Sequence, residues 1–124
     1  MANQPLKGIE RLKAAFLNSR QGARDIWRGE EAFRLEVIIL LVGVPIAFWL
    51  AKDYFQTAIL IGTILILITV EILNSAIEAV VDRIGPERHE LSRMAKDLGS
   101  LAVLVATGLV ILIWGAALLD RFLH

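Results

Sequence analysis

The sequence TAILIGTILILITVEILNSAIEAVVDRIG, from Thr57 to Gly85, begins as a largely apolar stretch and then acquires polar residues at regular intervals. The polar residues that share one face are Glu71, Asn74, Ser75, Glu78 and Asp82. The last four follow the first by three, four, seven and eleven positions, so at about 100° per residue they form one helical stripe. Carboxylates at membrane depth are costly, roughly +2.5 to +3.5 kcal/mol for an aspartate at a helix centre, and therefore indicate function. The stretch predicts a membrane helix that carries a functional site.

The composition supports a membrane protein. Of the 124 residues, 56% are hydrophobic, and the mean hydropathy of +0.63 exceeds that expected of a soluble domain. Thirteen basic residues balance thirteen acidic ones, so only their distribution along the chain is informative. The absence of cysteine excludes disulfides, thiolate metal sites and cysteine nucleophiles. The length allows one domain, which we expect to span residues 1–124.

Two further apolar runs, Val37 to Ala51 and Leu98 to Leu119, bring the candidate membrane helices to three. The first run measures roughly 22 Å against a hydrocarbon core of roughly 30 Å. We expect this helix to continue to about Phe55, because a lysine and aromatic residues that suit the interface follow the run. In the third run, Gly108 and Gly115 are expected to permit close helix contacts. The predicted membrane helices are residues 35–55, 57–84 and 97–119.

The basic residues gather on one side of the predicted membrane. Seven precede Val37, one lies in the first loop, four lie between Asp82 and Asp97, and one follows Leu119. With three spans, the N-terminal segment and the second loop share a side, which then carries eleven of the thirteen. The positive-inside rule places this side, and with it the N-terminus, in the cytoplasm.

Residues 1–34 precede the first span and predict an amphipathic surface helix. The apolar side chains at helical spacing are Leu6, Ile9, Leu12 and Phe16. Basic residues lie between them, and the apolar pattern resumes after Gly22 with Ile26, Trp27 and Phe33. This pattern is typical of a helix that lies in the membrane interface.

More acids are expected on the cytoplasmic side. Glu30, Glu31 and Glu36 precede the first span, and Asp97 begins the third. Carboxylate oxygens suit magnesium, which commonly takes one or two of them together with nucleotide phosphates. Cationic side chains of the second loop could contact those phosphates. These are Arg88, His89, Arg93 and Lys96.

Several familiar motifs are absent. There is no GxxxxGK[ST] or GxGxxG, so a nucleotide would be held without a glycine-rich phosphate loop. The two histidines, His89 and His124, form no HExxH zinc motif. No serine has a histidine at a spacing that indicates a nucleophile, which argues against acyl-transfer chemistry.

Four short motifs resemble the signature of a known family. They are EAFRLE from Glu31 to Glu36, VEILNSAIEAVVDRIG from Val70 to Gly85, HELS from His89 to Ser92, and AKDLGS from Ala95 to Ser100. Together with the three-span layout, they are similar to the prokaryotic diacylglycerol kinases, and the related undecaprenol kinases share much of the pattern. The resemblance implies an all-α homotrimer in the bacterial inner membrane, with three transmembrane helices and a surface helix per subunit. It also implies that the enzyme transfers phosphate from ATP, with Mg²⁺, directly to diacylglycerol to give phosphatidic acid. The active sites would be shared between subunits.

The resemblance also implies roles for individual residues. Glu71 would be the base that takes the lipid hydroxyl proton, Glu30 and Glu78 would hold magnesium, and Asn74 would support that face. The implied ATP-binding residues are Arg11, Asn18, Glu30, Glu78, Glu87, Arg88, His89, Lys96 and Asp97. The implied lipid-binding residues are Arg11, Arg24, Phe33, Arg34, Glu36, Trp49, Glu71 and Ser100. Asn18 and Arg88 stand where well-known members are expected to carry aromatic residues, so the resemblance does not carry nucleobase contacts over to these two positions.

Three other functions are compatible with the sequence. An undecaprenol kinase would share fold, metal and base but accept a long polyisoprenol. A proton- or ion-conducting subunit would use Glu71 and Glu78 as a relay, although few polar residues between Thr57 and Val70 continue the stripe. A structural membrane subunit would use the stripe to contact a partner.

Overall fold

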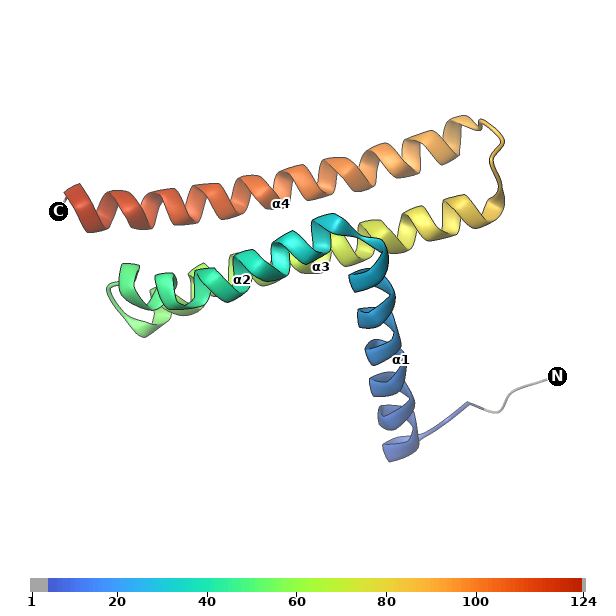
Figure 1. The fold of residues 1–124 in the computed structure, drawn as a ribbon, viewed down its shortest axis with the longest axis horizontal. Coiled ribbons are helices and arrows are strands. Elements are labelled where there is room, and N and C mark those ends of the chain that lie inside the picture. The colour runs from blue at the N-terminus through green and yellow to red at the C-terminus, as the bar shows by residue number, and fades with distance from the viewer. Residues whose placement is uncertain (1–4, 124) are drawn as a thin grey trace.

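The computed structural model describes residues 5–123, which form four helices and short connections (Figure 1). They are α1 (Gly8–Gly29), α2 (Glu31–Leu50), α3 (Tyr54–Ile84) and α4 (Glu90–Leu123). The helices α2, α3 and α4 are long and apolar enough to cross a membrane. The expected all-α fold with three candidate spans is therefore confirmed.

The central helix is α3, which packs against both α2 and α4, whereas α2 and α4 touch each other little. Along the bundle, α2, α3 and α4 run in alternating directions (Figure 1). At 1.5 Å per residue, the 31 residues of α3 measure about 46 Å and the 20 residues of α2 about 30 Å. The C-terminal part of α3 therefore extends beyond the start of α2. This part carries Glu78 and Asp82.

The first span ends earlier than predicted. Its helix was expected to continue to Phe55, but α2 ends at Leu50, and Tyr54 and Phe55 begin α3. The reason is an N-cap: the Asp53 carboxylate accepts a hydrogen bond from the backbone N–H of Gln56 at 2.7 Å. A side-chain acceptor at this position stabilises the start of a new helix, and here it fixes the turn.

The other helix bounds also differ from the predicted spans. α2 begins at Glu31 rather than at residue 35, and α3 begins at Tyr54 rather than at residue 57. α4 extends beyond the predicted 97–119 in both directions, because the charged segment before the apolar run continues the same helix. The apolar part of α4 thus continues, in one unbroken helix, from a polar N-terminal segment that carries Lys96 and Asp97.

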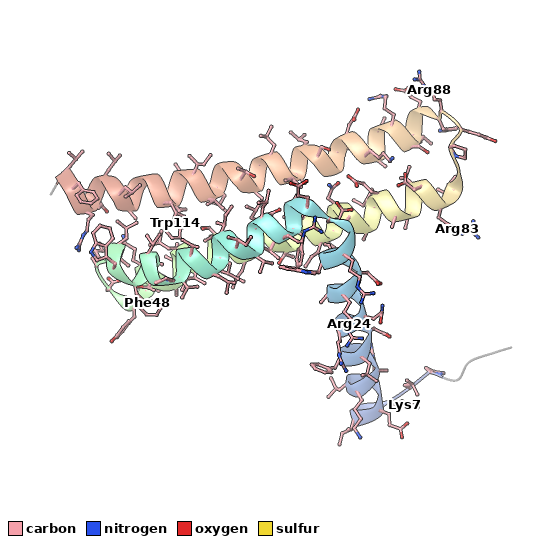
Figure 2. All side chains as sticks on the ribbon, viewed as in Figure 1. Lys7, Arg24, Phe48, Arg83, Arg88 and Trp114 are labelled. Atoms are coloured by element: carbon pink, nitrogen blue, oxygen red, sulfur yellow. The ribbon has the colours of Figure 1, made fainter. Side chains whose placement is uncertain are left out.

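An indole holds α4 against α3 in the half of the bundle nearer the α2–α3 turn. The Trp114 Nε1–H lies 3.1 Å from both the Leu60 carbonyl and the Thr63 hydroxyl oxygen and donates to them. Figure 2 shows Trp114 between α4 and the other two spans. Apolar packing continues toward the α2–α3 turn, where Ala47, Leu50, Leu60 and Ala117 form the buried core.

Within the chain, helices approach closely at two other glycines. A Cβ on Gly108 or Gly115 would meet nothing within 4 Å in the described chain, so the expected close contacts there are not made between helices of one subunit. Instead, a Cβ on Gly43 would lie 2.9 Å from Ile64 Cδ1. Gly99 is packed more tightly still, against Asn74. Absence of a side chain therefore matters where helices within this chain meet, at residues 43 and 99.

The helix α1 leaves the bundle at the start of α2 and points away from its long axis (Figure 1). It is continuous through Gly22 and has no buried residue. Arg34 Nη1 donates to the Trp27 carbonyl at 2.7 Å, which ties the C-terminal end of α1 to α2. An edge-to-face contact between Trp27 and Phe33, with centroids 6.4 Å apart, strengthens this junction. That α1 lies on the membrane surface stays a prediction.

Candidate active site

Four glutamates gather where α2 begins and crosses α3, and we call Glu30, Glu36, Glu71 and Glu78 the acidic cluster. Glu36 and Glu71 are 7% and 5% exposed, and their carboxyl groups interact with each other across the two helices. Glu30 and Glu78 lie close enough to Glu71 to act on it electrostatically. Carboxylates are rarely buried without cationic partners, so this arrangement indicates a site rather than a packing device.

Exposure increases along the polar stripe of α3 toward its C-terminal end. Glu71 and Asn74 are buried, Ser75 and Glu78 are half-buried, and Asp82 is exposed. The Asn74 amide connects two of these levels, because its Nδ2 donates to Glu78 Oε1 at 3.2 Å. The stripe therefore leads from a dry carboxyl group to a water-accessible one along a single helix face.

The facing part of α4 supplies a cation. Lys96 Nζ lies 2.8 Å from Asp82 Oδ1 and is also within electrostatic reach of Glu78. Asp97 points elsewhere and accepts from Arg93 at 2.6 Å, and Arg93 also pairs with Glu90. Lys96 is thus the basic residue of α4 that the fold brings next to the stripe.

One cleft adjoins the acidic cluster, and a second adjoins the exposed end of the polar stripe. A cleft of about 540 Å³ lies between α1, the start of α2 and α3, and Glu30, Phe33 and Ser75 are among its lining residues. The Ser75 hydroxyl is buried and has no hydrogen-bond partner among residues 5–123. A second cleft, of about 550 Å³, follows the loop from α3 to α4 and is lined by Asp82 and Lys96 with loop residues.

The loop cleft is lined by four of the predicted ATP-binding residues, Glu87, Arg88, His89 and Lys96. Arg88 lies at the tip of the loop, at the end of the bundle opposite Phe48 (Figure 2). His89 Nδ1 accepts a hydrogen bond from the Leu91 backbone N–H at 3.0 Å, which caps α4. In the neutral imidazole, this leaves Nε2 to carry the proton and donate to a ligand.

Other predicted residues are exposed in this chain. Arg11 is 18 residues from the end of α1 at Gly29, or about 27 Å along the helix. Asn18 and Arg24 lie on the same exposed helix, and Arg24 is labelled in Figure 2. Ser100 is exposed on α4.

Two predicted lipid-binding residues have structural partners. Trp49 lies at the opposite end of α2, where Arg121 stacks over its ring at 4.7 Å and Phe122 lies 6.0 Å away. Arg34 donates to carbonyls that end α1. Trp49 is therefore remote from Glu71, whereas Arg34 positions the segment that carries Glu30.

The acids fit magnesium better than a metal that requires a closed protein cage. Within residues 5–123, no group of three or more acidic or histidine side chains is arranged to hold a metal ion. Glu30, between α1 and α2, and Glu78 of α3 both act electrostatically on Glu71 and are both half-buried, so each can present an oxygen to solvent. Magnesium commonly takes one or two carboxylates and completes its shell with water and phosphate, which matches this donor set.

Comparison with known proteins identifies the family. A model described as prokaryotic diacylglycerol kinase matches residues 17–118. The chain belongs to this family. A diacylglycerol kinase of Escherichia coli is 47% identical over 122 residues, 98% of this chain and 99% of the relative. One of Pseudomonas aeruginosa is 42% identical, covering 96% and 99%, and one of Haemophilus influenzae is 40% identical, covering 90% and 94%. The recognition made from the four motifs is confirmed, and membership of the prokaryotic diacylglycerol kinase family makes the chain a kinase.

Two features of this family member were missed from the sequence. The contact of Gly99 with Asn74 is one, although the AKDLGS motif contains that glycine. The other is the orphan hydroxyl of Ser75 in the cleft beside Glu30. Helical periodicity placed Ser75 on the stripe, but only packing shows which polar atoms are left without partners.

Proposed function

We propose that this kinase transfers the γ-phosphoryl group of magnesium-bound ATP directly to the hydroxyl of diacylglycerol, giving phosphatidic acid and ADP. The observation that carries this proposal is the buried Glu71 carboxyl group with Glu30 and Glu78 beside it. The relatives are named diacylglycerol kinases, which supports a lipid alcohol as acceptor. The site lies at the cytoplasmic interface, where a lipid and a soluble nucleotide can meet.

Glu71 acts as the general base. It takes the proton of the lipid hydroxyl as that oxygen attacks the γ-phosphorus, and the bond from phosphorus to the β,γ-bridging oxygen breaks. The shared electron pair leaves with ADP, so no phosphoenzyme is needed. Glu71 is the most buried acid of the cluster, and a desolvated position suits a carboxylate that must accept a proton from an alcohol.

Glu30 and Glu78 are the residues that would hold Mg²⁺. When bound, the ion would neutralise charge on the β- and γ-phosphates, which is much of what phosphoryl transfer requires. Asn74 orients Glu78 through its Nδ2–H. Lys96, beside Glu78 and Asp82, contributes positive charge toward the nucleotide.

The remaining assignments follow the family resemblance. The nucleotide is held by Glu87, Arg88, His89 and Asp97 around the loop, and by Arg11 and Asn18 of α1. The lipid lies against Phe33, Glu36 and Ser100 with Arg11, Arg24, Arg34 and Trp49. The cleft beside Glu30 and Phe33 supports this division, because it borders both the surface helix and the polar stripe.

The protein acts as a homotrimer with shared sites. Support comes from the separation between α1 residues such as Arg11 and the acidic cluster of the same chain, about 27 Å along the helix. A neighbouring subunit can supply what one chain does not reach. The test uses mixed oligomers of Glu30→Gln and Glu71→Gln chains, each inactive alone. Recovered activity supports sites shared between those residues, and its absence in verified mixed oligomers contradicts them.

The enzyme lies in the bacterial inner membrane with its N-terminus in the cytoplasm. The charge distribution supports this orientation, since eleven of thirteen basic residues fall on that side. The helix α1 then lies on the membrane surface with Ile9, Leu12 and Phe16 toward the lipid. These side chains are each 70% exposed in the isolated chain, as such a role requires.

The decisive experiment incubates purified protein with radiolabelled ATP, magnesium and a panel of lipid alcohols. Phosphatidic acid should be the main labelled lipid, and undecaprenol and a soluble alcohol should be poorer acceptors. Preferential labelling of undecaprenol would identify the alternative lipid kinase. A labelled protein that can pass its phosphate to lipid would refute direct transfer.

A further inference from the structure

The side chain of Asn74 fills a space on α4 that exists because residue 99 is glycine. A Cβ built on Gly99 would overlap Asn74 Oδ1, and would lie 3.1 Å from Asn74 Cγ and 3.8 Å from Asn74 Cβ. The three nearest atoms to that position all belong to Asn74. Gly99 and Asn74 are both buried. The two residues therefore meet directly at the α3–α4 contact.

The Asn74 amide is held by its two ends. Its Nδ2 donates to Glu78 Oε1 at 3.2 Å, and its Oδ1 is buried against Gly99 with no hydrogen-bond partner among the described residues. The carboxylate of Glu78 is an acceptor only, so it selects the NH₂ end of the amide. The oxygen must then point into the space at Gly99, because the amide group is planar.

The same face of α4 docks on the same face of α3 one turn away. Lys96 lies three residues before Gly99 and pairs with Asp82, while Asp82 follows Glu78 by four residues. Residues three and four apart share a helix face. Gly99 is thus part of the α4 surface that contacts the polar stripe, and a side chain there would act on the stripe directly.

We propose that Gly99 is a positioning residue for the kinase reaction. Its missing side chain keeps Asn74 in place, and Asn74 in turn orients the Glu78 carboxylate toward the magnesium–nucleotide complex. The inference rests on the proposed function, which assigns Glu78 to magnesium. In this proposal Gly99 acts through Asn74 and Glu78 and has no direct contact with metal or substrate.

A glycine within a helix normally destabilises it relative to alanine, so a Gly→Ala change at an open position should be neutral or stabilising. Gly108 lies on the same helix with no neighbour within 4 Å in the described chain and is the matched control. At Gly99 the new methyl group would displace the Asn74 amide and remove the donor from Glu78. Loss of such a supporting hydrogen bond commonly lowers metal affinity by about 10- to 100-fold.

The test is a double-mutant cycle of Gly99→Ala and Asn74→Ala, with Gly108→Ala and Glu78→Gln as controls. The readouts are Mn²⁺ binding, followed by electron paramagnetic resonance in the presence of a non-hydrolysable ATP analogue, the magnesium dependence of lipid phosphorylation, and the thermal unfolding midpoint. We expect Gly99→Ala to weaken Mn²⁺ binding by at least about tenfold. The Gly108→Ala variant should stay within about twofold of the parent protein.

The double variant decides the mechanism. With Asn74 truncated, the added methyl group has room, so the double variant should bind Mn²⁺ as Asn74→Ala does and unfold at an equal or higher temperature. Two independent losses that multiply would overturn the proposal, as would parental Mn²⁺ affinity in a folded Gly99→Ala protein. If Gly99→Ala does not fold, Asn74→Ala must restore folding. A double variant that fails to fold while Asn74→Ala folds would also overturn it.

The Glu78→Gln control separates this inference from the proposed function. Parental Mn²⁺ affinity in Glu78→Gln would show that Glu78 is not a metal ligand, and the proposed function would then fail. Weakened binding in Glu78→Gln with parental binding in Gly99→Ala would leave the proposed function intact and reject the role of Gly99.

Discussion

Replacing Glu71 with glutamine should abolish most turnover while leaving nucleotide binding nearly intact. Glu71 and Glu78 share a face of α3 but are seven residues, or about 10 Å, apart along the helix. One group therefore cannot serve both the lipid hydroxyl and the metal. Glu71 is 5% exposed and Glu78 half-buried, so the deeper carboxylate is the one placed to act on the lipid.

The size of the effect follows from the role. Removing a general base costs on the order of 10² to 10⁴ in rate, or about 2.7 to 5.4 kcal/mol of transition-state stabilisation. Since the base acts mainly in the transition state, the KM for ATP should change little. The fold should survive. In the native protein two acids, Glu71 and Glu36, face each other, whereas a glutamine at residue 71 can donate a hydrogen bond from its amide to the Glu36 carboxyl group.

The assay measures phosphatidic acid formation at saturating magnesium-ATP and diacylglycerol, with ATP affinity determined separately. The contrasting variant is Glu78→Gln, which should raise the magnesium requirement and weaken nucleotide binding together with activity. Near-normal turnover of Glu71→Gln under saturating conditions would show that the base assignment is wrong. A large rise in KM with unchanged turnover would instead place Glu71 in ground-state binding.

Three further predictions concern the fold and the nucleotide. Trp114→Phe keeps an aromatic ring but removes the indole N–H donor between α4 and α3, and should lower the unfolding free energy by roughly 0.6 to 1.7 kcal/mol in detergent-induced unfolding. No change in that free energy would mean that the hydrogen bond does not stabilise the fold. Asp53→Ala removes the cap of α3 and should cost about 1 kcal/mol in the same assay, whereas Asp53→Asn should cost less because the amide oxygen can still accept. Lys96→Met should raise the KM for ATP without altering the unfolding midpoint, since the Lys96 and Asp82 side chains are 45% and 68% exposed and such a pair stabilises little. An unchanged KM would exclude Lys96 from the nucleotide site.

Much of the candidate site could be predicted because it is periodic. Glu71, Asn74 and Glu78 are placed on one face by helix geometry alone, whatever packs against that face. Their depth in the membrane stays a prediction, based on an α3 that is longer than the membrane core is thick. The structure adds their burial within the protein, with Glu71 and Asn74 buried and Glu78 half-buried. Their chemical roles stay predictions that the experiments above address.

The sequence by itself determined the class of the protein, the number of spans and the polar face, because apolar run length and helical period are local properties that survive any arrangement of the helices. The end of the first span was missed although its cause is local, since the Asp53 side chain caps the helix that begins at the next residue. Only the tertiary structure decided which side chains α3 and α4 bring into contact. It also decided that Gly99, and not Gly108, meets a neighbouring helix within the chain. Such contacts depend on which faces of α3 and α4 meet, and that is settled by packing between residues distant in sequence, which no local pattern encodes.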